Sequence, residues 1–147
     1  MLLLDANILI YAFREELPQH VSARAWLLGA LSASDPIGVP TLAEIAFLRL
    51  CTKPLGPLKA ATWEATWNFL AVLFGHRTSL RVVPGARHPE LLDGLARRYG
   101  LKGDGLVDGW LAAVALEQDA TFVSADYGFS RFEGLKWMDP VGSTTLR

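Results

Sequence analysis

The chain alternates short apolar runs with longer segments in which apolar residues recur every three or four positions. Residues 2–4 form a continuous apolar run, which is typical of a strand buried on both faces. Residues 20–34 carry apolar residues at helical spacing. Further strands are predicted at 37–40, 80–85, 120–126 (with its turn) and 135–140. Further helices are predicted at 6–16, 42–52, 58–75, 88–100 and 106–118, with a short helical turn at 127–132.

This alternation of strands and helices predicts the fold class. Parallel strands need a crossover connection, and helices supply it, so the sheet is expected to be mainly parallel with helices on both faces. The 147 residues fit one domain, 1–147, with no repeat or linker. In such folds, functional side chains gather at the carboxyl ends of the strands, where the strand order reverses.

Composition and charge narrow the function classes. Hydrophobic residues make up 51% and charged residues 20%, as in ordinary globular proteins. The net charge of −1 gives no general attraction to nucleic acid or to an acidic membrane. A polyanionic ligand would therefore need a local basic patch or a bound metal ion. Cys51 is the only cysteine, which favours a reducing cytoplasm. No run is long and apolar enough to predict a membrane span.

Four acidic residues lie in apolar surroundings: Asp5, Glu44, Asp108 and Asp126. Asp5 ends the first predicted strand and Asp126 follows the fourth. Burying an ionised carboxylate without a partner is costly, so the fold must supply a cation or hydrogen bonds.

Each acid also has an ordinary structural explanation. Asp5 is a possible N-cap of the first helix, and Glu44 a possible capping-box partner of Thr41. Asp108, or Asp104 four residues earlier, suits a helix start, and Asp126 suits a turn.

Taken together, the four acids favour a metal site, because all four are placed at the same end of a parallel sheet. Carboxylates brought close together repel and raise one another's pKa, and a divalent cation removes that penalty. All-oxygen ligation points to Mg²⁺ or Mn²⁺, and no pair of histidines or cysteines competes for a softer metal.

The sequence segments "LLLDANILIYA", "TLAEIAFLRL", "GDGLVDGWLAAVA" and "FVSADYGFSRFEGLKWMDP" resemble, in that order, the PIN-domain family and its VapC-type toxin ribonucleases. The resemblance covers residues 2–140. It implies a three-layer α/β/α sandwich with about five strands and a metal-dependent endoribonuclease that leaves a 5′-phosphate and a 3′-hydroxyl. It places the family's first, third and fourth acids on Asp5, Asp108 and Asp126.

The second acid of the family has two possible positions. In close relatives it commonly lies nearer "FLR", at the position that Ala46 takes here. Glu44 is the acid that this chain offers, and it fits the broader family pattern. Two positions on a helix differ by roughly 200° in direction, so only one of the two can point into the site. We take Glu44 as the second acid, with Asp104 as a possible extra one.

The resemblance also assigns supporting roles. Asn7 and Ser124 would orient the acids. Because the net charge is only −1, basic side chains must bind the RNA, and Arg14, Arg49 and Arg131 are candidates; each also suits an ordinary solvated surface. A VapC-type toxin implies a cognate antitoxin and a homodimer. Trp63 and Trp67, four residues apart on one helix, suit either the core or an exposed patch for a partner.

Two rival hypotheses remain at this point. A catalytically inactive PIN-fold module would bind RNA or protein, and the uncertain second acid favours it. A phosphatase of α/β type would use Asp5 as its nucleophile. Such phosphatases usually have a second acid two residues after the nucleophile, and this chain has Asn7 at that position.

Overall fold

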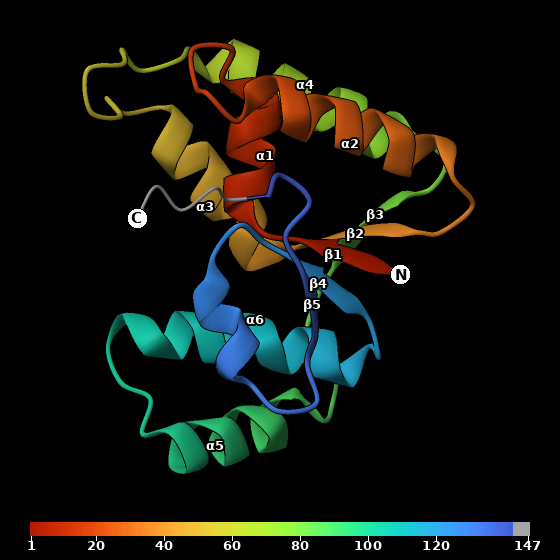
Figure 1. Cartoon of the computed structure of the whole chain (residues 1–147), viewed down its shortest axis with the longest axis vertical. Coiled ribbons are helices and arrows are strands. Elements are labelled where there is room, and N and C mark those ends of the chain that lie inside the picture. The colour runs from red at the N-terminus through yellow and green to blue at the C-terminus, as the bar shows by residue number, and fades with distance from the viewer. Residues whose placement is uncertain (143–147) are drawn as a thin grey trace.

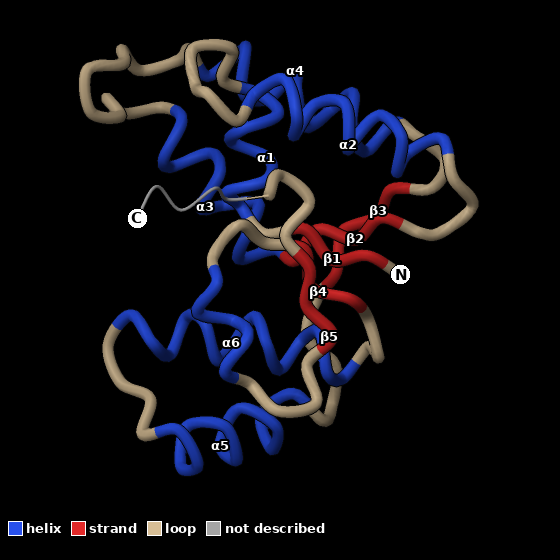
Figure 2. Tube along the Cα trace, viewed as in Figure 1, coloured by secondary structure: helices blue, strands red, loops and turns tan. Residues whose placement is uncertain are grey.

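The computed structural model describes residues 1–142, and a five-stranded parallel sheet lies at its centre (Figures 1 and 2). The strands have the order β3-β2-β1-β4-β5. Their bounds are β1 Leu2–Leu4, β2 Ile37–Pro40, β3 Ser79–Val82, β4 Thr121–Val123 and β5 Lys136–Met138. Every neighbouring pair is parallel, as predicted.

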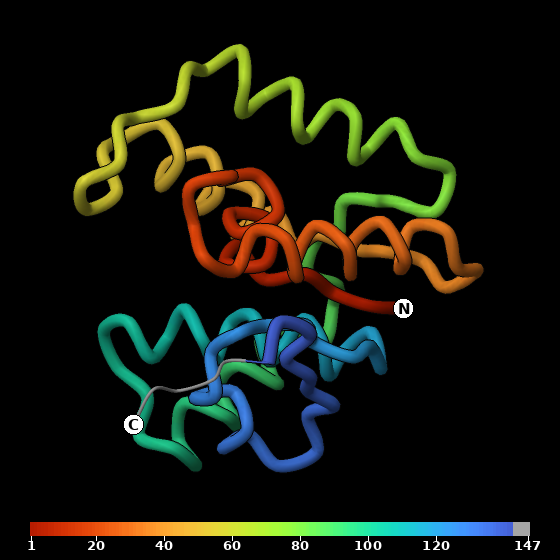
Figure 3. Tube along the Cα trace, turned by 45° about the horizontal axis from the view of Figure 1, so that its top comes forward, coloured from red at the N-terminus to blue at the C-terminus, as the bar shows by residue number. Residues whose placement is uncertain are grey.

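Helices cover both faces of the sheet. Their bounds are α1 Ala6–Phe13, α2 His20–Ser32, α3 Thr41–Cys51, α4 Trp63–Gly75, α5 His88–Tyr99 and α6 Asp104–Glu117, with the 3₁₀ helix η1 at Tyr127–Arg131. Helices α1 to α4 lie on one side of the sheet and α5 and α6 on the other (Figures 1 and 3). The predicted three-layer α/β/α sandwich is therefore confirmed.

Strand order explains why polar side chains can gather at one place. From β1 the chain moves outward through β2 to β3, and then returns to place β4 on the other side of β1. Leu4 pairs with Val123 in register, so the residues that follow β1 and β4 leave the sheet side by side. This is the reversal of strand order at which α/β folds place their sites.

Core residues hold the carboxyl ends of β1 and β4 in place. Leu3 and Leu4 of β1 and Phe122 and Val123 of β4 are fully buried. On α6, the run from Ala112 to Ala115 is fully buried too, and its small side chains let this helix lie close to the sheet. Burying one such leucine stabilises the fold by about 2 kcal/mol.

Several helix boundaries differ from the prediction by one to five residues, and the two largest differences have a local reason. The first helix ends at Phe13, because Arg14 takes an extended backbone conformation. The fourth begins at Trp63 instead of residue 58, because the Thr62 side chain caps it by accepting from the Ala65 amide. The sixth begins at Asp104. Within the described part of the chain, no helix has the length and apolar character needed to cross a bilayer.

Candidate active site

A cleft of about 340 Å³ opens at the carboxyl ends of β1 and β4. Three of the predicted acids line it: Asp5 after β1, Asp108 on α6 and Asp126 after β4. Segments that are more than a hundred residues apart in sequence thus contribute to one site.

Asp5 is held by hydrogen bonds on both carboxylate oxygens. Its Oδ1 accepts from the Ala6 amide at 2.7 Å, which makes Asp5 the N-cap of α1. Its Oδ2 accepts from Ser124 Oγ at 2.6 Å and from Asn7 Nδ2 at 3.1 Å. The helix-cap explanation is therefore correct, and it coexists with a position in the cleft.

Ser124 and Asn7 also connect the two central strands. Asn7 Nδ2 donates to Ser124 Oγ at 3.0 Å, and Asn7 Oδ1 accepts from the Ala125 amide at 3.2 Å. Ser124 Oγ accepts from the Asp126 amide at 3.1 Å. The network fixes where Asp5 and Asp126 stand relative to each other, which is the orienting arrangement expected of these residues.

Burial raises the pKa of Asp5 above its ordinary value of 3.8, and the negative charges of Asp126 and Asp108 raise it further. The hydrogen bonds from Ser124 and Ala6 act in the opposite direction. The Asp5 carboxylate thus stands in an environment that disfavours its own charge, and a nearby cation would relieve this.

The other two acids stand at the open side of the cleft. Asp126 Oδ1 accepts from the Gly128 amide at 2.8 Å, as a turn acid does. Asp108 lies inside α6 and does not cap it, because that helix begins at Asp104 after Gly103. Its Oδ2 accepts from Arg131 Nη2 at 3.1 Å.

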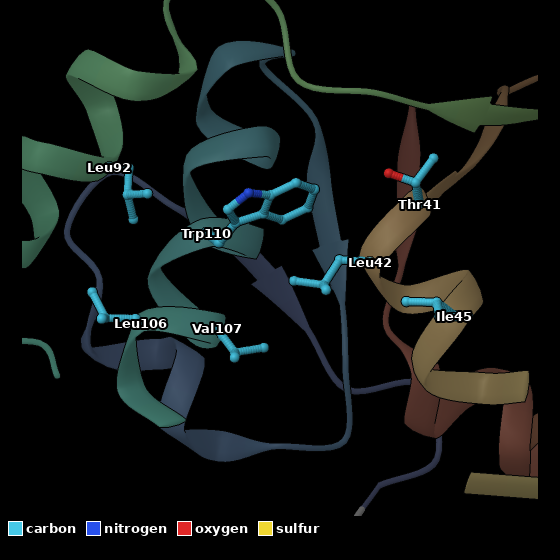
Figure 4. A pocket seen from close by; sticks show the side chains of 7 residues that line it. All are labelled: Thr41, Leu42, Ile45, Leu92, Leu106, Val107 and Trp110. Atoms are coloured by element: carbon cyan, nitrogen blue, oxygen red, sulfur yellow. The ribbon is translucent and has the colours of Figure 1, made fainter. Parts of the chain in front are cut away.

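The cleft continues into an apolar groove of about 600 Å³ between α3 and α6. Leu42, Ile45 and Val107 line both. In Figure 4, Leu42 of α3 points toward Trp110 of α6 across this groove. Ile45 and Val107 are 57% and 46% exposed, so the mouth of the cleft has an apolar rim.

The sequence and the fold agree with those of known proteins. The family model of the PIN domain matches residues 2–135. The chain is 33% identical to VapC ribonuclease Mb2897 of Mycobacterium bovis over 145 residues, which cover 99% of each protein. The chain belongs to the PIN-domain family, in its VapC group.

Solved structures show the same fold. VapBC2 from Rickettsia felis, bound to a DNA fragment from its promoter, matches this PIN domain with a TM-score of 0.68 at 18% identity, over 94% of this chain and 97% of that one. VapC20 of Mycobacterium tuberculosis, a toxin that cleaves the sarcin-ricin loop, gives 0.66 at 15% identity, over 88% and 93%.

Glu44 does not reach the cleft of this PIN domain. Both of its carboxylate oxygens accept from Arg81 Nε of β3, at 3.1 and 3.0 Å. The alternative role, a capping box with Thr41, is absent too, because Thr41 lies inside α3 and no side chain caps that helix. Ala46, the other position considered for the second acid, lines the cleft instead.

Helical spacing explains this outcome. Leu42, Ala46 and Arg49 follow one another at intervals of four and three residues, so they share the face of α3 that lines the cleft. Glu44 lies on another face of the helix. The cleft therefore receives several apolar side chains and one guanidinium from α3, and no carboxylate.

The remaining predicted residues have different surroundings. Arg49 is exposed and lines the cleft. Arg14 is buried, and its Nη2 donates to the Cys51 carbonyl at 3.0 Å, so it links the ends of α1 and α3. Asp104 is exposed at the start of α6 and does not line the cleft.

The donor chemistry of the cleft suits a hard divalent cation, because its charged acceptors are all carboxylates. Within residues 1–142, however, no three histidine, cysteine, aspartate or glutamate side chains are gathered closely enough to hold one ion as they stand. The Asp108 carboxylate in particular is engaged by Arg131.

Proposed function

We propose that this PIN domain is a metal-dependent endoribonuclease and the toxin of a toxin–antitoxin pair. The observation that supports it best is the convergence of Asp5, Asp108 and Asp126 on one cleft. The chain is also 33% identical, over nearly its whole length, to a protein named as a VapC ribonuclease.

The three aspartates are the residues that would hold Mg²⁺ or Mn²⁺, with Asp5 and Asp126 as the central ligands. When bound, such an ion activates water and neutralises charge on the scissile phosphate. Ser124 and Asn7 keep the Asp5 carboxylate in one orientation. Arg49 supplies positive charge beside the cleft, where it can contact the RNA backbone.

Partners and compartment belong to the same proposal. An antitoxin is supported by fold relatives that were solved as VapBC complexes. A homodimer is supported by exposed apolar side chains on two surfaces: the rim of the cleft, and α4, where Trp63 and Trp67 stack at 5.3 Å while 53% and 45% exposed. The lone Cys51 keeps the reducing cytoplasm as the expected compartment.

Cleavage of end-labelled structured RNA tests the proposal. We expect wild-type protein to cut with Mg²⁺ or Mn²⁺ and to stop with EDTA, and Asp5→Asn to be inactive. Asp93→Asn is the matched control, because Asp93 pairs with Arg97 on the exposed surface of α5, away from the cleft. If folded wild-type protein cuts no RNA and calorimetry detects no metal binding, the chain is a PIN-fold binding module instead.

The phosphatase alternative has its own test. It requires a covalent aspartyl-phosphate on Asp5, and mass spectrometry after incubation with a phosphomonoester would detect it. In the structure, both Asp5 oxygens accept hydrogen bonds from Ala6, Ser124 and Asn7, an arrangement that suits a fixed metal ligand better than an attacking nucleophile.

A further inference from the structure

Arg131, one of the predicted RNA-binding residues, does not itself line the cleft but forms an ion pair with Asp108, which does. It ends η1, the blue turn beside α6 in Figure 1. Its Nη2 donates to Asp108 Oδ2 at 3.1 Å and its Nη1 to the Gly128 carbonyl at 3.2 Å. Its guanidinium carbon lies 4.5 Å from the centre of the Phe132 ring. Three contacts of different kinds thus define where this cation sits.

Gly128 makes the approach of Arg131 to the acids possible. A Cβ at this position would lie 3.0 Å from Asp126 Oδ1 and 3.1 Å from Arg131 Nη1. The same residue donates its amide to Asp126 and accepts from Arg131. A side chain here would press on both groups, and each would have to shift by a few tenths of an ångström.

The charge balance of the cleft gives Arg131 its significance. Over residues 1–142, it is the one cation in ion-pair contact with any of Asp5, Asp108 and Asp126. The pair is partly open to solvent, with Arg131 39% and Asp108 30% exposed. An ion pair of this kind is weak enough to exchange partners.

A metal ion and Arg131 would compete for the same carboxylate. A cation that takes Asp108 as a ligand must share or displace the guanidinium, because Asp108 Oδ2 already accepts from it. A displaced guanidinium carries two parallel donors, and a phosphate group is an acceptor that matches such a fork.

We infer that Arg131 is an internal counter-ion of the cleft, which exchanges Asp108 for a backbone phosphate of the RNA when substrate binds. The inference rests on the proposed function and extends it to a second role for one residue. Without RNA, Arg131 weakens metal binding by occupying Asp108. With RNA, the released Asp108 is available to the metal, so RNA and metal each strengthen the binding of the other by the same factor.

Calorimetric titration with Mn²⁺ tests this exchange, with and without a short single-stranded RNA that carries phosphorothioate linkages. In Arg131→Gln without RNA, we expect Mn²⁺ to bind about threefold tighter than in wild type, the scale of one partly exposed ion pair. The strengthening of Mn²⁺ binding by RNA should be smaller in this variant than in wild type. Arg131→Lys keeps the positive charge but lacks the forked donors. RNA should strengthen its Mn²⁺ binding more than in Arg131→Gln and less than in wild type.

Arg97→Gln is the matched control, since it removes an arginine whose ion pair with Asp93 lies on the exposed surface of α5. Its Mn²⁺ affinity should equal that of wild type. Thermal unfolding establishes whether each variant is folded. If Arg131→Gln is not folded, Arg131→Lys is used in its place.

The outcomes separate this inference from the function on which it rests. If wild-type protein binds Mn²⁺ and cuts RNA, but Arg131→Gln binds Mn²⁺ equally or more weakly without RNA, Arg131 is a structural support of Asp108 and the exchange is wrong. If wild-type protein neither binds Mn²⁺ nor cuts RNA, the proposed function fails and the exchange fails with it.

Discussion

The two sides of the cleft are built differently. On one side, Asp5 is half-buried and accepts hydrogen bonds from Ala6, Asn7 and Ser124, between the two central strands. On the other, Asp108 stands partly exposed on α6 in an ion pair with Arg131. The first arrangement is set by the sheet itself. The second depends on an ion pair between two partly exposed side chains, so the cleft combines one carboxylate held by several hydrogen bonds with one held by a single ion pair.

Replacing Asp5 and Asp108 separately tests most strongly whether the two sides of the cleft differ in function. Asp5→Asn should reduce the rate of RNA cleavage by more than about a hundredfold, because even residues that only orient a metal ligand cost ten- to a hundredfold. Asp108→Asn should reduce the rate less, because Asp108 completes the site from its open side. Single-turnover cleavage rates of both variants measure the two effects. Equal reductions in rate would show that Asp5 and Asp108 contribute equally to cleavage.

Ser124→Ala tests the side of the cleft on which Asp5 is held by hydrogen bonds. Loss of the 2.6 Å hydrogen bond should reduce cleavage by about ten- to a hundredfold. Because this bond lowers the pKa of Asp5, its loss should also raise that pKa further. The acid limb of the pH–rate profile should then move to higher pH. An unshifted limb would mean that Asp5 does not control it.

The two positions on α3 test which residue faces the cleft. Glu44→Gln should leave the cleavage rate unchanged and destabilise the fold by up to about 1 kcal/mol, through loss of the Arg81 ion pair. Ala46→Glu should instead strengthen Mn²⁺ binding, because it adds a carboxylate to the cleft. Cleavage rates, calorimetry and urea unfolding measure these effects. A large loss of cleavage activity in Glu44→Gln would show that Glu44 contributes to the active site.

The stability of the metal-free protein should depend on pH through Asp5. Since its folded-state pKa is raised, the contribution of Asp5 to stability is complete below about the ordinary value of 3.8 and is lost as the pH rises through the folded-state pKa. Asp5→Asn should therefore show a flatter dependence of unfolding free energy on pH over that window. Urea unfolding in EDTA at several pH values measures it, and identical slopes would contradict the pKa direction.

The smallest expected effect concerns Cys51, at the end of α3. Burial raises the pKa of its thiol to about 11, and the positive charge of Arg14 opposes this. The thiol should therefore react with a disulfide reagent at pH 8 only after unfolding. Rapid reaction of the native protein would show that the ends of α1 and α3 open easily.

The sequence predicted the layers and the parallel sheet, because these follow from hydrophobic periodicity, and it placed Asp5 and Asp126 at the same end of that sheet. That their strands are neighbours is seen only in the fold. The sequence led us to Glu44 as the second acid, whereas in the structure Glu44 pairs with Arg81 and Ala46 lines the cleft. A helical pattern tells which residues share a face, but the face that meets the sheet edge is set by how α3 packs in three dimensions. The same limit hid the Arg131–Asp108 pair, because η1 and α6 meet only in the folded chain.

The most direct measurement is the anomalous scattering of Mn²⁺ in crystals of the protein soaked with this ion. We expect a peak in the cleft at about 2.1 Å from carboxylate oxygens of Asp5 and Asp126, and none beside Glu44. A peak on Glu44, or no peak in the cleft at any Mn²⁺ concentration that the crystals tolerate, would contradict the claim that these aspartates form a metal-dependent nuclease site.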